Sequence, residues 1–368
     1  MNHPLFSRFD NFSKNVPARV ENFSTGWQSP SNIALVKYWG KKDSQLPLNP
    51  SLSMTLNRAV TQTRVYASFE ETIAGLISVN GDQHHPFLPK MEQLLKRLTI
   101  EIPCLGRLSF RAETSNTFPH STGIASSASG MSAFALCLLD IACKVMKAEI
   151  PVADWLPIAS YVSRMGSGSA CRSLYGGFAL WGKTPVISES SDDFAVSVSG
   201  RIHPDFLSLR DAILIVSTLP KLVPSSQGHQ SMNGHPFMAY RISQANQNLA
   251  DALHALSTYD FEQLVSIAEN EALSLHALLM SAHPWTILIQ PGTLAIVHHV
   301  REARKEGLPV FFTLDAGANV HILYPMDSTT KVEKFINEVL SPFCEDGRVI
   351  FDSCGAGPVQ LAENPEKS

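Results

Sequence analysis

The sequence predicts a two-domain protein in which both halves combine β-strands with α-helices. Its 368 residues, 44% of them hydrophobic, exceed the roughly 250–300 residues at which a single core stops growing. In the first half, apolar residues recur at three- and four-residue spacing over 131–146, which is typical of a buried helix. In the second half, a similar pattern over 294–303 is followed by Gly307, Pro309 and strand-forming residues over 310–313.

The domain boundary is expected in an ordinary loop near residue 200. The sequence has no internal repeat, low-complexity tract or long Gly/Ser linker. The most polar and turn-rich segments near the middle of the chain are 188–193 and 199–204. We therefore place one domain before this point and the second over 201–368.

Charge and cysteine content exclude several classes of protein. The formal net charge of −4 provides no broad cationic field for nucleic acid or an anionic membrane, so neither is expected as a partner. The six cysteines contain no C-x-x-C pair and are predicted to be reduced. Residues 1–30 lack the apolar core of a signal peptide, and no run of 18 apolar residues follows. We expect a soluble, cytoplasmic protein.

A segment of small and hydroxyl residues over 119–129 directly precedes the first predicted helix. Small residues let a ligand approach the backbone, and the first N–H groups of a helix have no partner within it. The hydroxyls of Ser126, Ser127 and Ser129 add further donors, so the segment suits a phosphate group. The alternative is a serine-rich start to a core helix. The segment is not a Walker loop, because no G-K-[ST] follows.

A second Gly/Ser segment over 166–173 is followed by Gly176, Gly177 and a strand-like run. Arg172 lies about one helical turn after Ser169 and can present a bidentate guanidinium to a carboxylate or phosphate. This pairing suggests an acidic substrate. A tight helix-to-strand connection with Arg172 on a solvated face is the alternative.

Two further segments carry charged side chains at the ends of predicted strands. The apolar run over 32–41 ends in lysines and aromatics, so Lys41 and Tyr38 could hold phosphate oxygens and Lys37 could place positive charge beside reacting atoms. An amphipathic edge strand is the alternative there. Asp315 leaves a predicted strand at a glycine turn, where it could project into a cleft or simply form a hairpin turn.

These segments together resemble the diphosphomevalonate decarboxylases of the GHMP kinase superfamily. The motifs occur in the same chain order at 32–41, 46–56, 118–129, 166–177 and 315–320. The form G-I-A-S-S-A-S, with Ala125 where the wider superfamily has glycine, is similar to the decarboxylase branch. The resemblance implies an α+β GHMP kinase fold: an N-terminal domain like domain 2 of ribosomal protein S5 over 29–200 and a ferredoxin-like C-terminal domain. Residues 1–28 form an extension without an assigned counterpart.

The resemblance also implies roles for individual residues. It assigns Asp315 as the catalytic aspartate, Arg172 as the group that holds the substrate carboxylate, and Lys37 as a charge beside the reacting centre. The implied substrate positions are Asn32, Tyr38, Lys41, Ser169, Arg172 and Ser226. The implied nucleotide positions are Thr114, Asn116, Gly123, Ala125, Ser126 and Ser127.

The implied reaction is ATP-dependent decarboxylation of 5-diphosphomevalonate to isopentenyl diphosphate. Mg²⁺ is expected because phosphoryl transfer from ATP generally requires it, and a homodimer is expected as the assembly. No carboxylate cluster in the sequence identifies the Mg²⁺ ligands. The sequence departs from the family at Gln227, where several bacterial members have arginine, so a monophosphate substrate stays open. Phosphomevalonate decarboxylase, mevalonate 3-kinase and a non-catalytic binding protein are the alternatives.

Overall fold

The computed structural model of the chain describes residues 5–6, 22–42, 45–69, 75–118, 126–147, 149–219 and 225–362. Its first sheet has strand order β11-β1-β2-β4-β3, and β5 pairs with both β2 and β6. Its strands are β1 (Phe23–Val36), β2 (Ser51–Ser68), β3 (Gly75–Val79), β4 (Ser109–Asn116), β5 (Phe178–Trp181), β6 (Ala195–Ser197) and β11 (Val359–Gln360). All pairs are antiparallel except β3 with β4.

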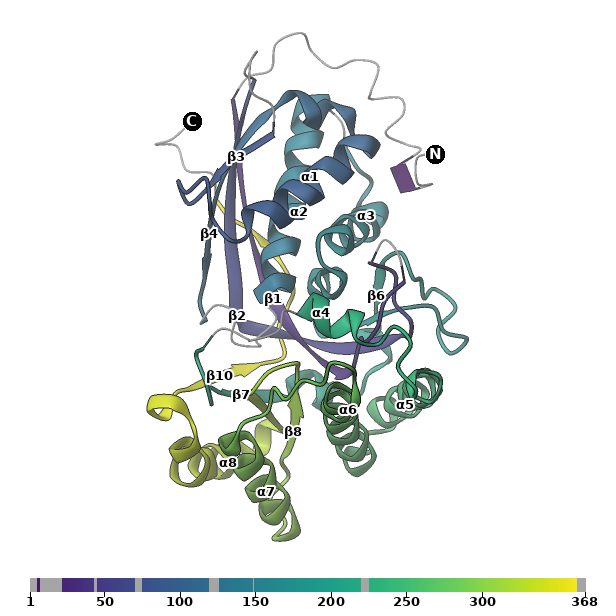
Figure 1. Cartoon of the computed structure of the whole chain (residues 1–368), viewed down its shortest axis with the longest axis vertical. Coiled ribbons are helices and arrows are strands. Elements are labelled where there is room, and N and C mark those ends of the chain that lie inside the picture. Colours follow the sequence, from purple (N-terminus) through teal and green to yellow (C-terminus); the bar gives the residue numbers. More distant parts are fainter. Residues whose placement is uncertain are drawn as a thin grey trace.

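Three helices lie against one face of this sheet (Figure 1). They are α1 (Leu88–Glu101), α2 (Ser126–Met146) and α3 (Val152–Gly166). Helix α2 is apolar around most of its circumference because it packs between the sheet and the other helices. It has the length and hydropathy of a candidate membrane span, but 78% of that stretch is buried inside the protein, as in the core helix of a soluble domain.

The second sheet is antiparallel throughout, in the order β10-β7-β9-β8. Its strands are β7 (Arg210–Leu214), β8 (Phe311–Leu314), β9 (Val320–Tyr324) and β10 (Val349–Ser353). The helices of this half are α4 (Ser225–Gln230), α5 (Met238–Thr258), α6 (Phe261–Ser281), α7 (Pro291–Lys305) and α8 (Thr329–Phe335). Gly307 follows α7 with a φ of +88°, which confirms the predicted helix stop.

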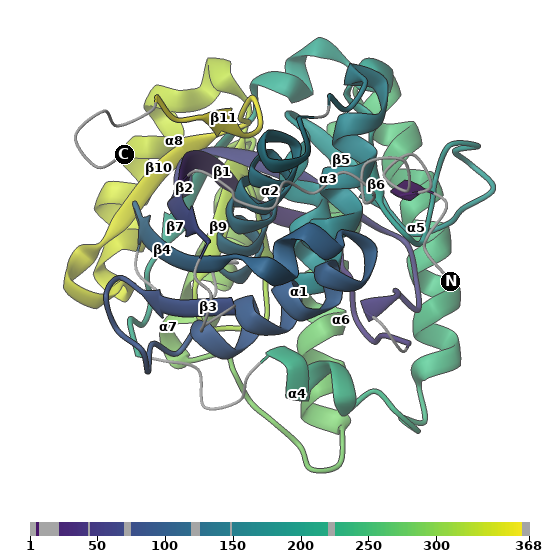
Figure 2. The same ribbon diagram turned by 90° about the horizontal axis from the view of Figure 1, so that it is seen from above.

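The two halves are joined by hydrogen bonds as well as by packing. The carboxylate of Asp352 on β10 accepts backbone N–H bonds from Asn57, Arg58 and Ala59 on β2, at 2.7–2.9 Å. Strand β11, near the C-terminal end of the chain, returns to pair with β1 in the first sheet (Figure 2). The first sheet therefore contains chain segments from both sides of residue 200, whereas the four strands of the second sheet all follow it.

The mixed α+β architecture confirms the predicted fold class. Three details differ from the sequence-based expectations. Strand β1 begins at Phe23, inside the predicted extension, because 23–36 pair continuously with β2 apart from two register shifts. That strand ends at Val36, before the two lysines; among the described residues it pairs with β2 along most of its length and with β11 only at Trp27 and Gln28. Helix α2 begins at Ser126, a turn earlier than the apolar pattern indicates.

Candidate active site

Two cavities lie on either side of the N-terminal end of helix α2. The larger, of about 450 Å³, is lined by the end of β1, the segment after α3 and the turn after β8. The smaller, of about 250 Å³, lies among β2, β4, α1 and α2. Ser126 lines the smaller cavity and Ser127 the larger one. Consecutive residues at the start of α2 therefore connect the two.

Lys37 and Asp315 form an ion pair in the larger cavity. Lys37 follows β1 and Asp315 follows β8, and Nζ of the lysine lies 3.1 Å from Oδ1 of the aspartate. The lysine side chain is 1% exposed and the aspartate 25% exposed. Burial lowers the pKa of Lys37, against the opposing effect of Asp315 and Glu271. Asp315 thus both begins the β8–β9 turn and reaches the cavity, so the two sequence-based interpretations hold together.

The backbone of Lys37 is fixed by a buried ion pair from two helices of the second half. Arg241 of α5 and Glu271 of α6 lie 2.6 Å apart and are almost fully buried. Glu271 accepts the Lys37 N–H at 2.8 Å, and Arg241 donates to the Lys37 carbonyl oxygen at 3.2 Å. Asn49 donates to the same carbonyl at 2.9 Å. This pair, absent from the sequence-based interpretation, therefore positions the end of β1.

Glu271→Gln is expected to move the alkaline limb of the kcat/KM profile to lower pH. The charge of Glu271 raises the pKa of Lys37. The amide keeps an acceptor for the Lys37 N–H but removes that charge, so the lysine loses its proton at lower pH. Kinetics between about pH 6 and 10 measure the limb. Glu269→Gln, which breaks the α6 ion pair with Arg304, is the control and should leave the limb in place; equal shifts would contradict the prediction.

Arg172 lies in the short 3₁₀ helix Gly168–Leu174 and is 3% exposed. Its Nε and Nη2 each donate to Oδ1 of Asn32 at 3.3 Å, and Nη1 donates to the Ser51 hydroxyl at 2.5 Å. Among the described residues, no carboxylate lies within ion-pair distance of this guanidinium. A buried cation that lines a cavity and has only neutral partners is well placed to receive an external carboxylate.

Asn32 supports Arg172 instead of facing the reacting groups directly. Its amide Nδ2 donates to the Ser173 hydroxyl at 2.8 Å, which fixes Oδ1 toward the arginine. Asn32 does not line either cavity among the described residues, whereas Ser169 lines the larger one. The structure therefore places Asn32 behind Arg172, and not at the cavity surface where substrate binding was predicted for it.

Cations gather at another part of the larger cavity. Lys41 lines it together with Lys90 and Arg97 of helix α1. Burial lowers the pKa of Lys41, and the positive charges of Arg97 and Lys90 lower it further. The Tyr38 hydroxyl is buried without a hydrogen-bond partner, and burial raises its pKa, so it stays protonated. Like charges held together in a cavity favour a multiply charged anion.

The α1 cations were missed from the sequence, although their spacing carries a signal. Lys90, Gln93 and Arg97 recur at three- and four-residue intervals, so they share one face of α1, and all three line the cavity. Gln227, in contrast, is exposed and is not among the residues that line it. Among the described residues, the cations that line this cavity besides Lys37 and Arg172 are therefore Lys41 and the two from α1.

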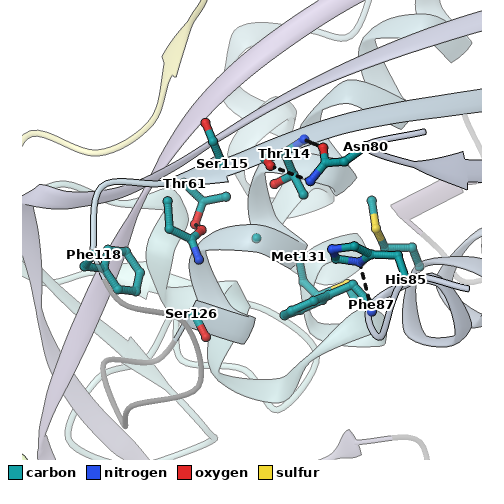
Figure 3. A pocket seen from close by; sticks show the side chains of 12 residues that line it. Thr61, Asn80, His85, Phe87, Thr114, Ser115, Phe118, Ser126 and Met131 are labelled. Carbon is teal, nitrogen blue, oxygen red and sulfur yellow. Dashed lines mark hydrogen bonds between the residues drawn. The ribbon is translucent and has the colours of Figure 1, made fainter. Parts of the chain in front are cut away.

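The smaller cavity has an apolar wall and a polar rim (Figure 3). Phe87, Met91 and Met131 contribute apolar side chains. On the opposite side, the Asn80 amide bonds the backbone of Thr114 through its oxygen at 2.7 Å and its nitrogen at 3.0 Å. An apolar slot with amide and hydroxyl groups at its edge suits a flat heterocycle.

Three of the four predicted nucleotide positions that the structure describes lie at this smaller cavity. Thr114, Asn116 and Ser126 line it. Gly123 and Ala125 lie outside the described residues, as does the side chain of Ser226 in α4. No sequence pattern indicates Asn80, His85 or Phe87, because they come from loops whose approach to α2 depends on the tertiary fold.

Fold and site together define an enzyme of the GHMP kinase class, with a nucleotide-sized slot beside an acidic-substrate cavity. Residues 29–193 match the diphosphomevalonate decarboxylase-like N-terminal domain, and residues 212–367 match the mevalonate 5-diphosphate decarboxylase C-terminal domain. A diphosphomevalonate decarboxylase of Ganoderma lucidum is 31% identical over 90% of this chain and 86% of its own length. The chain belongs to the diphosphomevalonate decarboxylase family.

Solved structures agree with this assignment. The mevalonate diphosphate decarboxylase of Enterococcus faecalis superposes with a TM-score of 0.78 at 27% identity, covering 93% of this chain and 100% of that one. A structure of MDDEF in complex with MVAPP, AMPPCP and magnesium has the same TM-score at 28% identity and the same coverage.

Proposed function

We propose that this chain catalyses the ATP-dependent decarboxylation of 5-diphosphomevalonate to isopentenyl diphosphate, releasing ADP, phosphate and CO₂. One observation carries the proposal: a single cavity holds a group for each part of the substrate. The Lys37 and Asp315 pair suits the 3-hydroxyl, and Arg172 suits the carboxylate. The cluster of Lys41, Lys90 and Arg97 suits the diphosphate. MVAPP bound to MDDEF supports the same substrate.

The mechanism follows from these positions. Asp315 orients the tertiary 3-hydroxyl and accepts its proton as the oxygen attacks the terminal phosphorus of ATP. Lys37 and the Ser127 hydroxyl stabilise the charge on the transferring group. Arg172 holds the carboxylate so that the breaking C–C bond aligns with the C–O bond to the new phosphate. The C–C electrons then form the alkene, and phosphate leaves with the C–O pair.

Magnesium fits this site as a partner of the nucleotide phosphates. Within the described part of the chain, no three His, Cys, Asp or Glu side chains are grouped to hold a metal ion. Mg²⁺ commonly binds through substrate phosphates, waters and one or two carboxylates. The Ser127 hydroxyl, at the start of α2 and on the wall of the cavity, is an oxygen donor that would complete such a shell. The ion would neutralise charge on the phosphoryl oxygens.

The test supplies purified protein with Mg-ATP and mevalonate, 5-phosphomevalonate or 5-diphosphomevalonate in separate reactions. We expect equal amounts of ADP and CO₂, and only with the diphosphate. CO₂ from the monophosphate would instead identify a phosphomevalonate decarboxylase. ADP without CO₂ from mevalonate would identify a 3-kinase. If no substrate yields either product, the chain is a non-catalytic binding protein.

Gly130→Leu is expected to raise the KM for ATP at least about tenfold while changing the KM for diphosphomevalonate little. Gly130 lines the smaller cavity, and a Cβ there would have Thr61 as its nearest neighbour, at 4.0 Å. A leucine side chain would therefore fill the slot that we assign to adenine. Gly130→Ala is the control: it adds one methyl group and should leave the KM for ATP nearly unchanged. Equal KM values for ATP in all three proteins would place the base elsewhere.

We also propose a cytoplasmic homodimer. Six free cysteines support a reducing compartment. Exposed apolar side chains on the second half, including Phe237, Tyr240 and Trp285, are of the kind that subunit interfaces cover. Light scattering of the purified protein tests the dimer, because a monomer mass at micromolar concentration would contradict it.

A further inference from the structure

His229 reaches from helix α4 of the second half onto the first half of the protein. Its ring centroid lies 4.4 Å from that of Tyr38 and 4.7 Å from that of Trp39. Its Nδ1 accepts the backbone N–H of Gly40 at 3.1 Å. The same ring lines the larger cavity. Three consecutive residues after β1 therefore fix the orientation of this imidazole at the cavity wall.

The hydrogen bond from Gly40 decides which ring nitrogen carries the proton. A backbone N–H can only donate, so Nδ1 must be unprotonated. The neutral imidazole then carries its hydrogen on Nε2. Burial lowers the pKa of His229 to about 3, and the positive charges of Lys41 and Arg172 act in the same direction. The ring is therefore a neutral Nε2–H donor at physiological pH.

This donor is open to the cavity. Among the described residues, no atom accepts a hydrogen bond from Nε2 of His229. Nor is Nε2 one of the buried side-chain atoms that lack a partner. Because the ring faces pack on Tyr38 and Trp39 and Nδ1 is engaged by Gly40, Nε2 is the polar atom that His229 offers to the cavity.

The surrounding charges identify the end of the cavity to which His229 belongs. Lys41 is the charged group that most strongly opposes protonation of His229. Lys41 in turn is repelled by Arg97 and Lys90. We propose that His229 binds the substrate's diphosphate, donating its Nε2–H to a phosphoryl oxygen. The proposal rests on the function proposed above and adds a binding residue that reaches this site from the second half of the chain.

A neutral donor acts on the diphosphate differently from these cations. The lysines and Arg97 attract the diphosphate, whereas a ring held by packing and by Gly40 presents its single N–H in one fixed direction. A hydrogen bond from a preoriented donor to an anionic oxygen is stronger than a neutral pair and loses little entropy on binding. His229 therefore contributes to selecting the phosphorylated end of the substrate.

Imidazole nitrogen NMR tests the proposal without relying on activity. In protein labelled with ¹⁵N-histidine, the His229 signals are assigned by their loss in His229→Gln. We expect the Nε2–H tautomer in the free protein. Adding 5-diphosphomevalonate, or separately inorganic pyrophosphate, should shift Nε2 and leave Nδ1 almost unmoved. A proton on Nδ1, or an Nε2 signal that neither ligand moves, would overturn the proposal.

Kinetics of two variants give a second readout. His229→Met keeps a side chain of similar size but removes the donor, so the KM for 5-diphosphomevalonate should rise about tenfold or more while the KM for ATP stays within about twofold. His229→Gln retains an acceptor for Gly40 and an N–H for the phosphate, and should recover much of the loss. Gln230→Ala, at an exposed position of the same helix, is the matched control and should behave as wild type.

The outcomes separate this inference from the proposed function. If neither CO₂ nor ADP forms but pyrophosphate still moves the Nε2 signal, the proposed reaction fails and the phosphate-binding role of His229 stands. If decarboxylation proceeds and His229→Met has wild-type KM values, the role of His229 fails and the reaction stands. Equal loss in the Met and Gln variants would assign His229 to packing alone, which also overturns the proposal.

Discussion

Replacing Asp315 with asparagine is expected to lower turnover by at least about 10²-fold, the lower range for loss of a positioned acid or base. The amide preserves the β8–β9 turn, but it cannot accept the hydroxyl proton. It also leaves the buried Lys37 without the carboxylate that raises its pKa. Because phosphorylation precedes loss of CO₂ in the proposed mechanism, ADP and CO₂ should fall together.

The measurement compares steady-state release of both products with nucleotide affinity determined by calorimetry. ATP affinity should change little, because Asp315 lines the larger cavity and not the nucleotide slot. Asp327→Asn, at an exposed position beyond β9, is the matched control and should leave turnover intact. Turnover of Asp315→Asn within about threefold of wild type would remove the aspartate from the chemistry.

Local sequence patterns predicted those elements whose own residues indicate which face is buried or where the element ends. The apolar spacing of α2 and the glycine stop after α7 are of this kind. The sequence could not predict that β11 returns to pair with β1, because two residues carry almost no periodic signal. Strand β1 extends into the predicted extension for a related reason: its partner β2 runs on to Ser68, and pairing overrides the polar character of the segment.

The site was predictable where residues follow one another in a motif. Lys37, Arg172 and Asp315 were singled out from their own segments, and the structure brings all three to one cavity. Groups supplied by distant elements were not predictable in this way. Arg241 and Glu271 each lie more than 200 positions from Lys37 in the sequence, and no pattern near either residue predicts the contact.

At Gln227, the motif and the geometry point in different directions. Its neutral amide raised the question of a monophosphate substrate. In the structure Gln227 is exposed, and among the described residues the cavity is lined by Lys41 and by Lys90 and Arg97 of α1, in addition to Lys37 and Arg172. A one-dimensional alignment assigns charge to the segment that usually carries it, whereas a cavity can receive the same charge from any element that faces it.

Arg172→Lys is expected to lower kcat/KM for 5-diphosphomevalonate by about 10- to 150-fold, the range for losing a hydrogen bond to a charged group. Lysine keeps the charge but cannot bond Asn32, Ser51 and a substrate carboxylate at once, as the forked guanidinium can. The carboxylate would then be held without alignment. We therefore expect ADP to exceed CO₂, because the hydroxyl is still phosphorylated while decarboxylation is slowed.

The matched control is Arg164→Lys. Arg164 is also 3% exposed, donates to the Asp193 carbonyl oxygen and stacks over Tyr161, but it does not line the larger cavity. Arg164→Lys should lose about as much stability as Arg172→Lys, but it should still release one CO₂ for each ADP. Thermal unfolding and product ratios of both variants separate folding from alignment. A ratio of one in Arg172→Lys, with ATP affinity reduced in proportion to turnover, would place Arg172 at the nucleotide instead of the carboxylate.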